Sequence, residues 1–247
     1  MAERAAMEIV ARAHVGRHRE RNEDSVGVVV ERGLAVLADG MGGLADGDVA
    51  SRETVDYVLD ELRVRQPGRT RRLEPAVLEA ALRGANRHLR EVARERGGLM
   101  GTTAVVASLD DQGRCSLAFA GDSRAYVYRA GRLDQVSRDH SLVQEMVEHG
   151  QLDPAAARAS AMRNVITRAV GLEVELQPEH HELVLDSEDL LVLCSDGLWD
   201  MLAEAEIAGL LGAQGPAGGL AARADALVEA ANRAGGMDNI AVVLARP

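Results

Sequence analysis

The chain has 247 residues and a formal net charge of −11; 47% of its residues are hydrophobic and only 2% are aromatic. This length allows one large domain or two small ones, with a core of Val, Leu, Ala and Ile. The acidic balance excludes nucleic acid as the main partner, because phosphate backbones bind to basic surfaces. All 28 basic residues are Arg, so an anionic substrate needs local help from Arg or from a metal ion.

Several features predict a cytoplasmic protein. Cys115 and Cys194 lie in apolar segments without metal or redox spacing, so we expect buried free thiols, as in a reducing cytoplasm. The N-terminus has no apolar signal region. No apolar run approaches the roughly 20 residues of a membrane span, so no membrane association is expected. Because no tail or heptad region is present, we expect a monomer.

The first hundred residues predict strands followed by a pair of helices. Strands are expected at 7–14, 26–30 and 34–38, and helices at 48–62 and 75–94. The second helix keeps its apolar residues at a spacing of 3.6, and Pro75 suits its first turn. A polar break at 66–72 separates the two helices.

The remainder predicts more hairpins, an insertion and a second pair of helices. Short turns between the strands expected at 103–109, 115–120, 125–129 and 132–136 favour one antiparallel meander. Residues 139–161 break this rhythm with a short amphipathic helix and an Ala-rich piece, which indicates a mobile insertion over the sheet. The last elements are strands at 181–185, 190–194 and 240–245, and helices at 203–211 and 220–234. Because strands come in hairpin runs and helices in pairs, we expect a single α+β domain spanning 1–247.

Four aspartates carry the chemistry of the sequence. Asp39, Asp122 and Asp196 each follow an apolar run, and Asp238 directly precedes one. A carboxylate beside buried apolar residues is costly unless a cation neutralises it. Any one of them could be an ordinary turn residue at a strand end. Four in matching contexts instead favour a site for Mg²⁺ or Mn²⁺, which take oxygen ligands of this kind.

A charged loop near the N-terminus adds a candidate anion-binding residue. Arg19 lies three residues before the run Asn22-Glu23-Asp24. An Arg next to carboxylates in an acidic protein suits bidentate capture of a phosphoryl group. Glu23 and Asp24 could add metal ligands, either directly or through water. A solvated charged loop is the alternative for this segment.

The glycines after Asp39 allow two interpretations. The Gly40 carbonyl and the Asp39 carboxylate could both face a cation, since glycine lets the backbone approach closely. Residues 40–45 also fit the glycine pattern of a dinucleotide-binding turn. That alternative is disfavoured because Asp39 would repel a pyrophosphate. In addition, Asp60 and Glu61, about 20 residues on, fall in a helix instead of at a strand end.

The order of these motifs resembles the metal-dependent Ser/Thr protein phosphatases of the protein phosphatase 2C (PPM) family, particularly its compact bacterial members. The resemblance extends from about residue 15 to residue 243. It implies a four-layer αββα sandwich of two antiparallel sheets flanked by helix pairs, with a flap insertion at about 139–165. It also implies a dinuclear Mn²⁺ or Mg²⁺ centre at one end of the sandwich.

The resemblance also implies roles for individual residues. Asp39 would bridge the metals, with Gly40 as a carbonyl ligand and Asp196 and Asp238 as ligands of the first metal. Asp122 would bind a third, weaker metal, Glu23 and Asp24 would contact the site partly through water, and Arg19 would bind the substrate phosphate. Met41 stands where many eukaryotic members carry a His proposed as general acid, so we expect water in that role.

The implied activity is hydrolysis of phosphoserine and phosphothreonine by a metal-activated water, without a covalent phosphoenzyme. The implied partners are phosphorylated proteins, including a Ser/Thr kinase and its substrates in a bacterium. The alternative is a pseudophosphatase that binds phosphoproteins without hydrolysing them. Such a module would lack metal ligands, whereas every expected acidic position is filled here.

Overall fold

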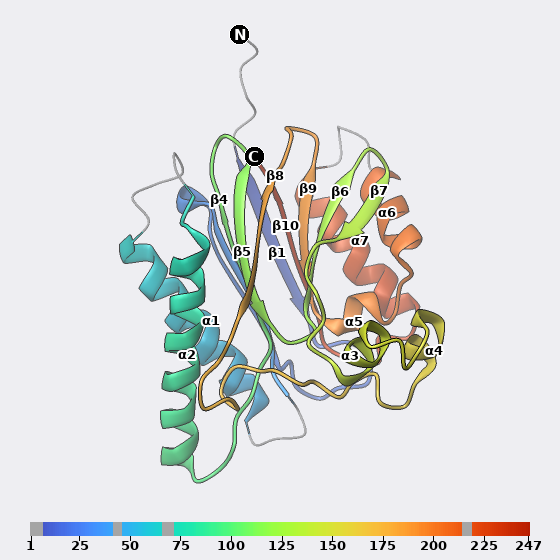
Figure 1. Cartoon of the computed structure of the whole chain (residues 1–247). Coiled ribbons are helices and arrows are strands. Elements are labelled where there is room, and N and C mark those ends of the chain that lie inside the picture. Colours follow the sequence, from blue (N-terminus) through green and yellow to red (C-terminus); the bar gives the residue numbers. More distant parts are fainter. Residues whose placement is uncertain (1–6, 42–45, 66–71, 214–218) are drawn as a thin grey trace.

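The computed structural model describes residues 7–41, 46–65, 72–213 and 219–247. Two antiparallel sheets lie face to face, and a pair of helices covers the outer face of each (Figure 1). The α+β class and the αββα layering predicted above are therefore confirmed.

Each sheet has five strands, and the chain passes between the sheets more than once. The first sheet contains, in spatial order, β1 (Glu8–His14), β10 (Ile240–Arg246), β9 (Leu190–Cys194), β6 (Arg124–Arg129) and β7 (Arg132–Gln135). The second contains β2 (Asp24–Val29), β3 (Leu34–Asp39), β4 (Ala104–Leu109), β5 (Arg114–Ala120) and β8 (Glu179–Val184). β1 and β10, which are far apart in sequence, pair along their full length.

Both faces of each central strand are buried. Val36 of β3 packs toward the helices α1 (Gly47–Arg65) and α2 (Pro75–Arg96), and its neighbour Leu37 packs between the sheets. This is the two-residue alternation of a strand. The helices α6 (Glu204–Ala213) and α7 (Leu220–Arg233) form the corresponding outer layer on the first sheet. The clusters consist mainly of aliphatic side chains, as the composition predicts.

The prediction of one meander across residues 103–136 is wrong. The β4–β5 hairpin belongs to one sheet and the β6–β7 hairpin to the other. The turn after β5 carries the chain across, with Gly121 at φ +107° and packed against Thr103. The Thr103 hydroxyl also lies 2.6 Å from that of Ser123. Apolar alternation does not tell two stacked sheets apart, so the crossing depends on this turn.

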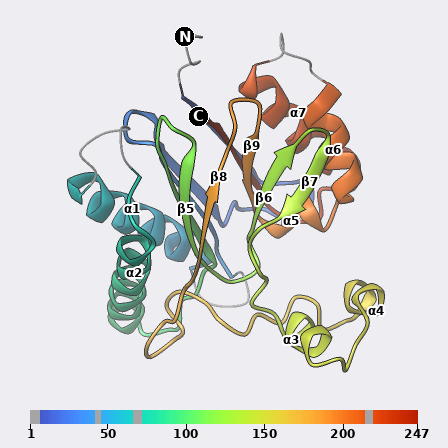
Figure 2. The same cartoon turned by 45° about the horizontal axis from the view of Figure 1, so that its top comes forward.

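The insertion predicted after residue 139 contains two short helices, α3 (Leu142–Glu148) and α4 (Pro154–Ala159). They lie outside both sheets at one end of the sandwich (Figure 2). Ser141 caps α3 and Asp153 caps α4 through their side chains. The mobility of this segment stays a prediction.

Two short elements were not predicted from the sequence: α5 (Asp196–Trp199) and a 3₁₀ turn at Val30–Arg32. Most of the polar break at 66–72, and residues 42–45 of the glycine pattern, lie outside the described residues. None of the described helices combines the length and apolar character needed to cross a bilayer.

Candidate metal and phosphate site

Strand ends bring the predicted acidic residues to one end of the sandwich. Asp39 ends β3 and stands opposite Asp24 at the start of β2. Asp196 follows β9, Asp238 precedes β10, and Asp122 lies in the turn after β5. Asp39 interacts electrostatically with the other four. The chain thus gathers the four strand-end aspartates and adds Asp24 to them.

The electrostatics of this cluster call for a cation. Burial raises the pKa of Asp39 well above its usual range, and repulsion from its acidic neighbours raises it further. Burial, with the same repulsion, raises the pKa of Asp24 and of Asp196 to about 7, and that of Asp122 to about 8. Burial and mutual repulsion both disfavour the charged carboxylates, and a cation between them would offset both effects.

The donor set fits a hard cation. The buried Oδ1 atom of Asp24 has no hydrogen-bond partner among the described residues. Carboxylate oxygens, together with backbone carbonyl groups and water, are ligands that Mg²⁺ and Mn²⁺ accept. Within the described ranges, no three His, Cys, Asp or Glu side chains are drawn together as a closed ligand set. Like-charged groups keep apart unless a cation lies between them.

Ser195 holds Asp24 in this cluster. Its buried hydroxyl donates to Asp24 Oδ2 at 2.7 Å and accepts the Ala241 N–H at 2.9 Å. One side chain thereby joins β2 of the second sheet to β9 and β10 of the first. Sequence reasoning missed this residue; its position directly before Asp196, at the end of a buried strand, was the available signal.

The Arg19 loop is fastened to the same end of the sandwich. Arg19 Nη2 donates to Asp238 Oδ2 at 2.7 Å. The Asn239 amide donates to the carbonyls of Val15 and Arg21, both at 2.9 Å, and its Oδ1 accepts the Glu23 N–H at 2.8 Å. Arg19 and Glu23 therefore reach the cluster through a loop whose path is set by Asn239.

Gly40 lies where another stretch of backbone comes close. Its N–H donates to the Glu23 carbonyl at 3.0 Å. A Cβ at Gly40 would lie 2.1 Å from the Gly47 carbonyl oxygen, so no side chain fits there without movement. The dinucleotide alternative involves residues 42–45, outside the described part of the chain, and the acidic cluster at Asp39 opposes a pyrophosphate beside it.

The α3–α4 segment, residues 139–165, packs beside this cluster. Arg163 Nη2 lies 3.3 Å from Asp200 Oδ2, one turn beyond Asp196. Arg124 donates from both Nε and Nη2 to Asp139 and lies over the Trp199 ring, 3.7 Å from its centroid. These residues line a cavity of about 560 Å³ between the segment and α5–α6. No local pattern in the sequence indicated these contacts.

Comparisons with known proteins match nearly the whole chain. A family model described as protein phosphatase 2C matches residues 12–241. The protein phosphatase PhpP of Streptococcus pneumoniae is 35% identical over 246 residues, covering 96% of each chain. The crystal structure of the Mycobacterium tuberculosis serine/threonine phosphatase PstP/Ppp is similar with a TM-score of 0.85 and 35% identity, over 97% of this chain and 98% of that one. A structure of the PstP catalytic domain with two manganese ions has a TM-score of 0.82 and 36% identity, over 97% of each chain.

Proposed function

The chain belongs to the protein phosphatase 2C family, and we propose that it hydrolyses phosphoserine and phosphothreonine esters of proteins at the acidic cluster. The observation that carries this proposal is the convergence of five carboxylates from both sheets, with Arg19 bonded to one of them. The five are Asp24, Asp39, Asp122, Asp196 and Asp238.

We propose that the cluster binds two Mn²⁺ or Mg²⁺ ions, with a third, weaker site. Asp39, the Gly40 carbonyl, Asp196 and Asp238 would hold the pair, and Asp122 the third ion. Glu23 and Asp24 would contact the pair partly through water. When bound, the ions supply an activated water as nucleophile and neutralise charge on the phosphate. The raised pKa values and the unpartnered Asp24 Oδ1 support this ligand set.

Arg19 would orient the phosphate of the substrate. The phosphate carries a charge of about −1.5 to −2 at neutral pH, and a guanidinium binds such an oxyanion through two parallel hydrogen bonds. Arg19 already donates to Asp238, so its head group lies at the cluster without substrate. A cation on Asp238 would compete for that carboxylate and free the guanidinium for phosphate.

A cysteine nucleophile is disfavoured. Cys115 and Cys194 are both buried, and burial raises the pKa of each thiol to about 12. The thiol therefore stays protonated at neutral pH, whereas the thiolate is the nucleophile. This supports direct attack by water without a covalent phosphoenzyme.

The similar proteins support a wider role in the cell. We propose one catalytic domain, acting as a monomer in the bacterial cytoplasm on proteins phosphorylated by a Ser/Thr kinase. The bacterial origin of the similar proteins and their description as serine/threonine phosphatases support this proposal.

Hydrolysis of a phosphothreonine peptide tests the activity and the metal site together. We expect phosphate release that depends on Mn²⁺. Asp238→Asn should lower its rate by about 10³-fold, because the variant loses a carboxylate that would hold a metal ion and so loses stabilisation of charge in the transition state. The matched control is Asp225→Asn, which removes an exposed carboxylate of α7 that is bonded to Arg12 of β1. This control should keep full activity.

The same assay separates the enzyme from a phosphoprotein-binding module. Mn²⁺ binding is measured by calorimetry and folding by circular dichroism on the unmodified chain. A folded protein that binds Mn²⁺ and the phosphopeptide but releases no phosphate would contradict the phosphatase proposal and favour the pseudophosphatase.

A further inference from the structure

A buried histidine lies where the base of the α3–α4 segment meets the turn that carries Asp122. His140 is 3% exposed, and its ring stacks on Phe119 with centroids 5.7 Å apart. Its ring nitrogen Nδ1 accepts a hydrogen bond from the Gly121 N–H at 3.1 Å, and the backbone N–H of His140 donates to the Gly121 carbonyl at 2.9 Å. The residue directly before Asp122 is therefore bound to His140 twice.

These contacts fix the tautomer of the ring. A backbone N–H only donates, so Nδ1 must be the unprotonated nitrogen, and a neutral imidazole then carries its proton on Nε2. Glu179 Oε1 lies 3.2 Å from Nε2 and accepts the hydrogen bond from that N–H. Arg168 Nη1 lies 3.1 Å from the same nitrogen, but as a donor it is served by Glu179 Oε1, 3.3 Å away. Burial, and next the charge of Arg168, lowers the pKa of His140, which supports a neutral ring.

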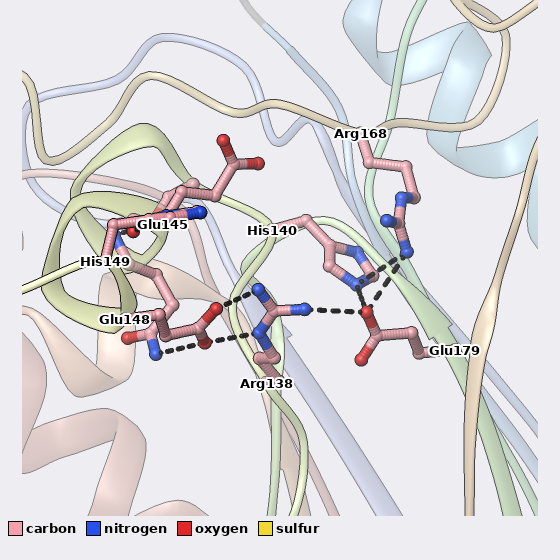
Figure 3. Close-up of polar contacts among 9 residues, drawn as sticks. Arg138, His140, Glu145, Glu148, His149, Arg168 and Glu179 are labelled. Atoms are coloured by element: carbon pink, nitrogen blue, oxygen red, sulfur yellow. Dashed lines mark hydrogen bonds and ion pairs between the residues drawn. The ribbon is translucent and has the colours of Figure 1, made fainter.

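Glu179 collects donors from both ends of the segment (Figure 3). Its Oε1 lies 3.0 Å from Arg138 Nη1, on the chain entering the segment, and 3.3 Å from Arg168 Nη1, on the chain leaving it. Arg138 also pairs with Glu148 of α3. One carboxylate at the start of β8 thus ties the entry, the exit and the first helix of the segment to the second sheet.

The backbone closes the same base. Thr167 N–H donates to the His140 carbonyl, and Leu142 N–H donates to the Val165 carbonyl, both at 2.8 Å. His140 therefore takes part in three links at once: to Gly121, to Glu179 and to the returning chain at Thr167. No other role assigned above uses its side chain.

We propose that His140 is a positioning residue that locks the Gly121–Asp122 turn to the base of the α3–α4 segment. Its Nδ1 fixes the turn through the Gly121 N–H. Its Nε2–H joins that turn to Glu179, which also binds Arg138 and Arg168. Asp122 would then be held in place by the segment's base as well as by the end of β5. The inference depends on the proposed function only through the metal-binding role of Asp122.

Two substitutions separate the two ring nitrogens. In His140→Asn the amide oxygen can occupy the position of Nδ1, which keeps an acceptor for the Gly121 N–H and loses the contact with Glu179. In His140→Gln the amide reaches the position of Nε2, which keeps a donor for Glu179 and loses the acceptor for Gly121. Loss of ring packing on Phe119 is common to both, so the pair is its own control for packing.

The first readout is amide hydrogen exchange at Gly121 and Asp122 in chelator-treated protein, which needs neither metal nor activity. We expect exchange about tenfold faster in His140→Gln and within about twofold of the unmodified chain in His140→Asn, as one lost hydrogen bond predicts. The Mn²⁺ concentration for half-maximal phosphatase activity should rise in the same order. Equal exchange in the two variants would overturn the proposal, whether or not the chain proves to be a phosphatase.

Glu179→Gln tests the contacts of Glu179 with Arg138 and Arg168, and it remains informative if a His140 variant does not fold. It keeps an oxygen acceptor but removes the charge that holds Arg138 and Arg168. We expect limited proteolysis within residues 142–165 to speed up several-fold, with Gly121 exchange unchanged. Glu182→Gln, on the same strand, is the matched control and should leave both rates unchanged. An unchanged proteolysis rate in Glu179→Gln would overturn the proposal that Glu179 holds the α3–α4 segment to the second sheet.

Discussion

Buried aspartates at the two ends of the sandwich have opposite electrostatic surroundings. At the end away from the cluster, Asp110 accepts the backbone N–H groups of Gln112 and Arg114, both at 3.0 Å, and the Arg114 guanidinium at 2.8 Å. Asp189 likewise accepts Arg129 and the Asp186 N–H. At the other end, Asp39 is repelled by Asp24, Asp122, Asp196 and Asp238, and Arg19 is bonded to Asp238.

The same residue type therefore serves two purposes, and the counter-charge distinguishes them. The carboxylates of Asp110 and Asp189 accept hydrogen bonds from backbone N–H groups and from an Arg of the same chain, so they stabilise turns. Asp24, Asp39 and Asp122 instead lie buried among acidic neighbours, so they store repulsion that a bound cation would relieve. A buried carboxylate alone indicates neither role; the charges around it do.

The largest expected effect is on activity at the crowded end. Asp39→Asn should lower Mn²⁺-dependent hydrolysis on the order of 10³-fold, because it removes a carboxylate that would hold the metals. The melting temperature of the metal-free variant should stay unchanged or rise, since the mutation relieves repulsion. Peptide hydrolysis and thermal melts in chelator measure the two. A variant that loses activity only because it unfolds would contradict this comparison.

The opposite end should show the reverse pattern. Asp110→Ala should lower the free energy of unfolding by about 2–3 kcal/mol, because two backbone N–H groups and a guanidinium lose their acceptor. Activity per folded molecule should not change. Urea unfolding gives the first quantity, and hydrolysis below the transition gives the second. A large loss of activity in stably folded protein would show that the two ends are coupled.

The pH dependence of metal-free stability sharpens the contrast further. In the folded protein, Asp24, Asp122 and Asp196 have pKa values of about 7 to 8, raised above the ordinary Asp value of 3.8. Their protonation favours the folded state, so this contribution is complete below pH 3.8 and is lost as the pH rises through 7 to 8.

The melting temperature in chelator should therefore fall between pH 6 and pH 9. A fall of more than about 2–4 °C, the shift from 1 kcal/mol in a domain of this size, is expected. Saturating Mn²⁺ should remove it, because the metal takes the place of the protons. A metal-free protein whose melting temperature rises over this range would contradict the assigned repulsion.

The smallest effect concerns the link between the sheets. Ser195→Ala removes the donor to Asp24 and the acceptor of the Ala241 N–H. We expect a loss of about 1–2 kcal/mol in unfolding free energy and a fall in activity of less than tenfold. Ser195→Thr, which keeps the hydroxyl, is the comparison variant. Equal activities and stabilities for the two would show that the hydroxyl does not hold Asp24.

Local patterns allowed most of the fold to be predicted, and pairing between distant segments explains what was missed. Period-two and 3.6-residue spacing located the strands and the long helices, since these are properties of neighbouring residues. The crossing at Gly121 was missed because both sheets bury both faces, so β5 and β6 look alike as partners. α5 was missed because four residues are too short to show periodicity.

The acidic residues were predictable because each follows or precedes an apolar run, which places it at a strand end. The residues that hold them were not. Ser195 contacts Asp24 across 171 positions of sequence, and Asn239 contacts Glu23 across 216. His140 and Glu179 are ordinary polar residues until the fold joins them. Hydrogen bonds between distant segments leave no local pattern in the sequence.

The pairing of β1 with β10 has a consequence for the order of synthesis. β10 lies between β1 and β9, and Asp238 and Asn239 immediately precede it. The first sheet therefore stays divided, and the Arg19 loop stays unfastened, until residues 238–246 have been made. A growing chain can already form the second sheet and its two helices, but it cannot hold the assembled cluster. Catalytic competence should thus arise abruptly, as the last strand enters the sheet.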